Sequence, residues 1–187
     1  MGGGRHLPGA VELSRRDGEE PRRRAEQHRP QGLGFAILLA LRPLFDVQVE
    51  LAEILSLGRT PLGERRIINI TGGSFAGERL SGRVLPGGAD WQIIRADGAA
   101  DLDARYTLQS AAGALIQVHS QGLRHGPPEV LARLAAGEPV DPSRYYFRTA
   151  LRFETGAAEL DWLNRVVAVA RGARLPRAVQ LNVFEVL

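Results

Sequence analysis

Cysteine is absent from the 187 residues of the chain. This absence excludes disulfides, thiolate metal sites and a cysteine nucleophile, and it is typical of a protein kept in the cytoplasm. Long apolar runs are missing as well, since none approaches the roughly 20 residues that a helix needs to cross a bilayer. We therefore expect a soluble cytoplasmic protein without a membrane partner, stabilised by the burial of apolar side chains alone.

Lysine is missing too, and all 24 basic residues are arginine. Arginine is not titrated at ordinary pH, so a formal net charge of only +3 gives a pI of about 10.1. Residues 1–32 hold seven arginines and five acids, which leaves 17 arginines against 16 acids, a net charge of +1, for the rest. This nearly neutral body, with only 6% aromatic residues, disfavours nucleic acid as a partner.

Large apolar residues are scarce in residues 1–32, which are rich in Gly, Pro and charge. Such a segment cannot bury enough surface to offset the entropy of ordering. We predict that residues 1–40 are a disordered extension and that residues 41–187 form the one domain. The apolar segment 32–41 could be a signal-peptide core, but we favour a first strand preceded by sequence from a mis-set translation start.

Short runs rich in Val, Ile, Phe and Tyr follow one another from residue 43 to the end, separated by Gly, Pro and Asp. They predict about nine strands in sequential hairpins. The pair Asp97-Gly98 is a strong hairpin signal because both residues tolerate positive φ. The predicted strands are 43–54, 65–72, 78–85, 90–95, 100–109, 114–120, 145–154, 166–170 and 178–186.

One helix is expected, near residues 128–136, where two prolines start the segment and Gly137 ends it. A single short helix cannot cover a sheet of nine strands. The sheet would therefore close on itself, which removes its edges. We predict an all-β fold, a single antiparallel closed barrel of about eight or nine strands, with a β-sandwich as the alternative.

Several motifs recur in order and at matching spacing over residues 42–187, and their set resembles the bacterial domain-of-unknown-function family DUF3237, also called UPF0311. The resemblance implies a compact β-barrel found alone in the bacterial cytoplasm, and no established reaction. The motifs are Thr71-Gly72-Gly73, Leu85-Pro86-Gly87-Gly88-Ala89-Asp90-Trp91, Asp103-Ala104-Arg105-Tyr106-Thr107-Leu108, Gly113-Ala114-Leu115-Ile116-Gln117-Val118, Tyr146-Phe147-Arg148-Thr149, Phe153-Glu154-Thr155-Gly156 and Trp162-Leu163-Asn164.

The predicted strand 100–109 has one wholly polar face, which carries Asp103 and Arg105, and an opposite face that carries Tyr106. The polar face is typical of a barrel wall in water. It could instead line a ligand cavity, where Asp103 would accept a proton and Arg105 would stabilise negative charge. Both residues and Tyr106 also belong to the family motif.

A second polar face joins Tyr146 and Arg148 on the predicted strand 145–154. It faces outward if the apolar face forms the core; in a polar cavity Arg148 would clamp a carboxylate or enolate oxygen. The catalytic candidates are therefore Asp103, Arg105, Tyr146 and Arg148. The ligand-binding candidates, each with a structural alternative such as a turn cap or a core anchor, are Asp90, Trp91, Tyr106, Glu154, Trp162 and Asn164.

No metal and no cofactor is expected. His119 and His125 have no third ligand at a suitable spacing, and no phosphate loop, dinucleotide fingerprint or nucleophile elbow occurs. Three hypotheses about function remain open: a cofactor-independent acid–base enzyme (isomerase, cyclase or dehydratase) acting on a small molecule, a non-catalytic carrier or sensor, and a homo-oligomeric interaction module.

Overall fold

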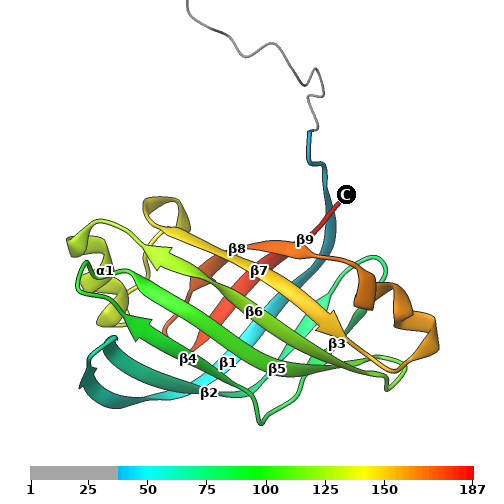
Figure 1. The fold of residues 1–187 in the computed structure, drawn as a ribbon, viewed down its shortest axis with the longest axis horizontal. Helices are drawn as coiled ribbons and strands as arrows, with labels where there is room; N and C mark the ends of the chain where they lie inside the picture. The colour runs from blue at the N-terminus through cyan, green and yellow to red at the C-terminus, as the bar shows by residue number, and fades with distance from the viewer. Residues whose placement is uncertain (1–37) are drawn as a thin grey trace, which may run out of the picture. The chain divides into compact units, whose positions relative to one another are not determined.

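Antiparallel strands make up most of the computed structural model, which describes residues 38–187 (Figure 1). The predicted extension over residues 1–40 lies outside the described residues, apart from its last three. Within the described part, no helix is long and apolar enough to cross a membrane. The strands are β1 (Leu41–Thr60), β2 (Gly63–Ala76), β3 (Ser81–Val84), β4 (Ala89–Ile94), β5 (Ala100–Ser110), β6 (Leu115–His125), β7 (Tyr146–Glu154), β8 (Ala168–Arg174) and β9 (Ala178–Val186).

The strands form a closed ring in which nearly all neighbours in space are neighbours in sequence. β1 pairs with β2 on one side and with β9 on the other, and the order then runs through β8, β7, β6 and β5. β3 and β4 share the place between β2 and β5, interrupted by residues 85–88, so the ring has eight positions. The predicted barrel is therefore confirmed in preference to the sandwich.

Turn chemistry sets where the strands end. Across the predicted Asp97-Gly98 turn, the Arg95 N–H donates to the Ala99 carbonyl oxygen, and Gly98 has a φ of +81°. The first two strands are longer than predicted because they stay paired out to Thr60 and Gly63. Their hairpin extends to the end of the barrel at which the helix lies (Figure 1).

The predicted helix is confirmed as α1 (Pro128–Ala135), followed by Gly137 at a φ of +75°. Two short 3-10 helices were not predicted, η1 (Pro142–Arg144) and η2 (Ala158–Arg165). The latter contains the Trp162-Leu163-Asn164 motif. α1 and η2 lie at opposite ends of the barrel (Figure 1), so the two ends are covered by different elements.

Inward and outward side chains alternate along each strand, as the two-residue period requires. In β7 every second residue is buried, from Phe147 to Phe153. In β5 the buried row contains Leu102, Tyr106 and Leu108, while Asp103 and Arg105 lie on the opposite face. The rows from all strands meet in one apolar core inside the barrel.

Gly172 shows how tightly this interior is packed. A Cβ atom at this position would lie 2.6 Å from the ring of Phe147 on the neighbouring strand. The small residue therefore makes room for the aromatic ring in the inward row of β8, between Ala170 and Arg174.

Candidate functional site

On three strands, the row of inward-facing side chains ends in an arginine at the α1 end of the barrel. On β2 the row runs from Ile70 and Ile68 to Arg66, on β6 it reaches Arg124, and on β8 it reaches Arg174. All three arginines are half-buried and line one cavity. The apolar rows thus form the core, and their last residues place positive charge at its open end.

The three arginines line an outer cavity of about 540 Å³, within the range typical of small-molecule sites. Gln92 and several apolar side chains complete its wall, and α1 covers one side. Exposed charged residues, Glu53, Asp97 and Arg177, stand at its rim. The apolar lining consists of Ile54, Ile68, Ile94, Leu131 and Leu134.

Within residues 38–187, two of the arginines form no ion pair with a carboxylate. Arg66 is neutralised by Glu64, whose Oε1 accepts a hydrogen bond from Nε at 2.8 Å. Among the described residues no carboxylate lies within 4.0 Å of Arg124 or Arg174. The guanidinium of Arg174 donates one hydrogen bond within the described part of the chain, from Nη1 to the carbonyl oxygen of Ala178 at 3.1 Å.

Burial disfavours the charged form of both arginines, and their pKa values are lowered as a result. Burial, and next the positive charge of Arg174, lower the pKa of Arg124 to about 10. Burial also lowers the pKa of Arg174. Both groups remain charged near neutral pH, so the cavity holds cations in a desolvated place where an anion would stabilise them.

The inward-facing row of β4 runs from Gln92, at the outer cavity, to Asp90, which lies farther inside the barrel. Its Oδ2 accepts a hydrogen bond from Gln92 Nε2 at 2.6 Å, and its Oδ1 accepts one from the backbone N–H of Asp103 at 3.2 Å. Burial raises the pKa of Asp90, while these two hydrogen bonds and the charge of Arg124 oppose the rise. Asp90 is therefore the interior carboxyl group whose proton is held more tightly than usual.

Asp90 also lines a smaller inner chamber of about 40 Å³. The hydroxyls of Tyr106 and Thr149 face this chamber, are almost fully buried, and have no hydrogen-bond partner within residues 38–187. Burial raises the pKa of Tyr106, which keeps its phenol neutral. The rest of the wall is mostly apolar and includes Leu102, Phe147 and Leu181.

The predicted catalytic residues lie elsewhere, on the outer face of the barrel. Asp103 Oδ1 is 2.7 Å from His119 Nε2 and 3.9 Å from Arg105 Nε, and all three side chains are partly exposed. Tyr146 stacks on His125 with ring centroids 4.9 Å apart, and the Arg148 guanidinium lies 5.2 Å from the Tyr146 ring centroid. The four candidates therefore fall into two surface clusters, Asp103 with Arg105 and Tyr146 with Arg148.

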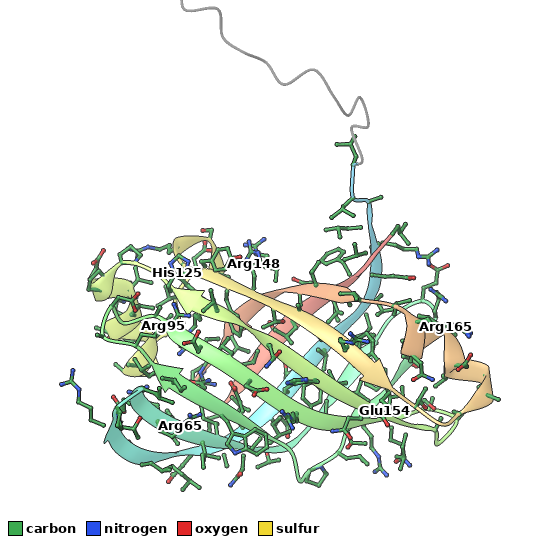
Figure 2. All side chains as sticks on the ribbon, in the orientation of Figure 1. Arg65, Arg95, His125, Arg148, Glu154 and Arg165 are labelled. Carbon is green, nitrogen blue, oxygen red and sulfur yellow. The ribbon has the colours of Figure 1, made fainter. Side chains whose placement is uncertain are left out.

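Of the predicted ligand-binding residues, Asp90 and Tyr106 face the interior, and the other four do not line either chamber. Trp91 and Glu154 are exposed. Trp162 lies under the Arg79 guanidinium, 3.7 Å from the ring centroid. Figure 2 shows Arg148 near the α1 end and Glu154 toward the opposite end, so these two candidates on β7 do not converge.

Asn164 has a structural role that its surroundings make clear. Its Oδ1 accepts the backbone N–H of Thr155 at 2.9 Å, and its Nδ2 donates to the Thr155 carbonyl oxygen at 3.0 Å. This amide joins η2 to the end of β7.

Six buried or half-buried polar residues that line the two chambers were not identified from the sequence: Arg66, Gln92, Ser120, Arg124, Thr149 and Arg174. A signal exists for Arg66, Ser120 and Thr149, which lie two positions from the buried Ile68, Val118 and Phe147 on their strands. A polar residue at such a position faces the core or a cavity. Among the described residues, no cluster of three or more His, Asp or Glu side chains could hold a metal ion.

The fold and the site together define a class of protein: closed up-and-down barrels with a polar cavity at one end of an apolar core. The chain belongs to the family described as protein of unknown function DUF3237, whose model matches residues 39–186. The resemblance noted in the sequence is therefore confirmed.

Relatives and solved structures agree with this assignment. A UPF0311 protein of Rhodopseudomonas palustris is 42% identical over 149 residues, covering 80% of this chain and 97% of that protein. A solved structure from the same species has a TM-score of 0.77 at 41% identity and covers 82% of this chain and 100% of its own. A β-barrel-like protein of Acinetobacter baumannii has a TM-score of 0.73 at 43% identity, with 83% and 100% covered.

Proposed function

We propose that the barrel binds a small organic anion in the outer cavity and that Asp90 exchanges a proton with it, as a cofactor-independent acid–base enzyme. One observation carries this proposal: Arg124 and Arg174 are half-buried and without an acidic partner among the described residues, beside an interior carboxyl group.

The two arginines favour a carboxylate or a related planar anion. Guanidinium groups bind such anions through paired N–H donors, and the bonds are stronger than those between neutral groups. The anion would replace the hydration that Arg124 and Arg174 lose on burial. The apolar walls contributed by Ile68, Ile94 and Leu131 suit a ligand with an apolar skeleton.

Asp90 supplies the acid–base group. Proton transfer is most efficient when the pKa of the catalytic group approaches the working pH, and burial moves the pKa of Asp90 upward, toward that range. Its hydrogen bonds to Gln92 and to the Asp103 backbone hold the carboxyl group in place. A carboxyl group so held can take a proton from a bound ligand and return it.

The binding part is tested with phenylbutanoate, a carboxylate with an apolar skeleton, and its neutral amide as the matched ligand. By calorimetry we expect the acid to bind more tightly than the amide, and Arg124→Gln to weaken acid binding about tenfold or more. Arg105→Gln, which removes an arginine from the outer face, serves as the control. Equal affinities for acid and amide, or an equal loss in both variants, would contradict the proposal.

The catalytic part is tested with the derivative that carries a ketone next to the carboxylate. In D₂O, NMR follows the exchange of the C–H protons beside the ketone. We expect the protein to accelerate exchange and Asp90→Asn to abolish the acceleration while retaining binding.

A non-catalytic carrier or sensor is the second candidate. It is favoured by the two hydrogen bonds that Asp90 already accepts, which also suit a purely structural carboxyl group. Tight binding of the keto acid with exchange no faster than in buffer would support the carrier and contradict the enzyme.

A further inference from the structure

The inner chamber points to a second recognition site, deeper than the arginines. Tyr106 is 3% exposed and Thr149 is 6% exposed, yet neither hydroxyl has a hydrogen-bond partner among the described residues. Buried hydroxyls are normally paired because an unpaired one loses its hydration without compensation. Both residues line one chamber, where a polar atom of a ligand would satisfy the two hydroxyls.

The chamber limits the size of that atom's group. Its volume of about 40 Å³ exceeds the roughly 10–15 Å³ that one water molecule needs and is far below the 540 Å³ of the outer cavity. The chamber therefore admits a small oxygen function, such as a carbonyl or a hydroxyl. Tyr106 can donate to such an oxygen, and Thr149 can donate or accept.

The two chambers are lined by neighbouring residues of the same strands. Asp90 lines the inner chamber, and Gln92, which bonds to it, lines the outer cavity. The same succession occurs on β2, where Ile70 lines the inner chamber and Ile68 the outer one. A ligand that spans both chambers would pass the Asp90–Gln92 pair and meet the arginines on one side and the two hydroxyls on the other.

We infer, on the basis of the proposed function, that the substrate is an oxo- or hydroxycarboxylic acid with an apolar skeleton. Its carboxylate binds Arg124 and Arg174, and its second oxygen enters the inner chamber and binds Tyr106 and Thr149. This arrangement sets the substrate apart from simple carboxylates, which would fill only the outer cavity.

For an oxo acid the assigned contacts define a balanced step. The Asp90 carboxylate takes the proton from the carbon beside the ketone, and the C–H electron pair becomes the C=C bond of an enolate. The carbonyl π pair moves onto the oxygen, which accepts the Tyr106 hydrogen bond. Return of the proton from Asp90 to that oxygen gives the enol, with no oxidant or reductant.

The test compares phenylbutanoate with its two keto derivatives, which carry the ketone next to the carboxylate or next to the ring. Calorimetry gives the dissociation constant of each for the wild-type protein. We expect at least one keto acid to bind about tenfold more tightly than phenylbutanoate, as one buried hydrogen bond implies.

The variants Tyr106→Phe and Thr149→Val remove one hydroxyl each with little change in shape. We expect them to lose the preference for the keto acid and to keep the affinity for phenylbutanoate. Tyr146→Phe and Thr107→Val, which change hydroxyls on the outer face, are the matched controls and should retain the preference. Thermal unfolding establishes that all four variants are folded.

The outcomes separate the two proposals. If keto acids and phenylbutanoate bind equally and Arg124→Gln weakens them all, the substrate class is wrong and the proposed function stands. If Tyr106→Phe and Thr149→Val weaken all three ligands alike, the hydroxyls do not recognise the second oxygen and the inference fails. If none of the three binds to the wild-type protein, both proposals are contradicted.

Discussion

Gln92 donates a hydrogen bond of 2.6 Å from Nε2 to Oδ2 of Asp90, its neighbour in the same inward row of β4. Gln92 is only 4% exposed, so this amide replaces water as the partner of the carboxyl group. The bond favours the charged form and opposes the effect of burial on the Asp90 pKa. The hydrogen bond from Gln92 thus influences the protonation state of the Asp90 carboxyl group.

Replacing Gln92 should therefore change how Asp90 titrates. In Gln92→Leu the charged carboxylate loses its side-chain donor, so we expect the pKa of Asp90 to move further upward. The carboxyl ¹³C chemical shift of Asp90, followed by NMR through a pH titration, measures the change. Gln117→Leu, on the exposed face of β6, should leave the titration where it is. A downward shift in Gln92→Leu would refute this account of the pair.

The stability of the protein should depend on pH through Asp90. Its folded-state pKa is raised above the ordinary 3.8, so the folded protein holds the proton more tightly than the unfolded chain. The stabilising contribution is fully present below the unfolded value and is lost as pH rises through the folded pKa. Asp90→Asn cannot titrate and avoids that loss.

The gain in unfolding free energy of Asp90→Asn over the wild type should therefore be larger at about pH 7 than at about pH 4. Urea denaturation at the two pH values measures it. A difference that is independent of pH would show that burial does not perturb this carboxyl group.

Arg124→Gln should stabilise the protein in the absence of ligand. The pKa of Arg124 is lowered to about 10, so at neutral pH both folded and unfolded states carry the charge and the folded state bears the full cost of its burial. Solvent in the cavity reduces that cost, and we expect a gain of about 1 to 2 kcal/mol. The gain should fade as pH rises above the folded pKa. Loss of stability at neutral pH would mean that Arg124 has a structural partner.

Thr149→Val should also raise stability. The variant replaces a buried hydroxyl without a partner among the described residues by a methyl group of similar size. Relief of the desolvation cost is expected to add about 1 kcal/mol to the unfolding free energy. Thr107→Val, on the outer face of β5, should give no such gain. Urea denaturation compares the two, and equal effects would argue against a cost at Thr149.

Gly172→Ala should be strongly destabilising, because the new methyl group would lie 2.6 Å from the Phe147 ring. Overpacking of this kind costs about 1 to 3 kcal/mol. Gly156→Ala is the matched control, since nothing lies within 4 Å of the position its Cβ would take. Thermal unfolding of both variants checks the prediction, and similar midpoints would show that Phe147 moves aside freely.

The fold could be predicted because its signals are local. Turn residues such as Asp97-Gly98 mark the strand ends, and the two-residue period separates Tyr106 from Asp103. Closure of the sheet followed from the scarcity of helix to cover it. The 3-10 helix η2 escaped prediction because short helices of this type depend on packing against the barrel more than on their own sequence.

The site was harder to predict because alternation tells which residues share a face and not which face encloses a cavity. Asp103 and Arg105 were predicted as site residues because they belong to an unbroken polar row. An unbroken polar row is, however, also what a strand face exposed to solvent has. The interior charges stand singly at the ends of apolar rows, as Arg124 does after Gly122 on β6. Their convergence depends on barrel closure, which joins residues from β2, β6 and β8.

Closure has a consequence for how the protein is made. β1 pairs with β9, so Leu41 gains its partner Val186 only after β9 has been synthesised. Until residues 178–186 emerge, the nascent chain presents unpaired edges on β1 and β8, the kind of edge that invites aggregation. Val179 and Leu181 of β9 line the inner chamber, so a ligand that reaches this chamber can stabilise the barrel only after β9 has joined it.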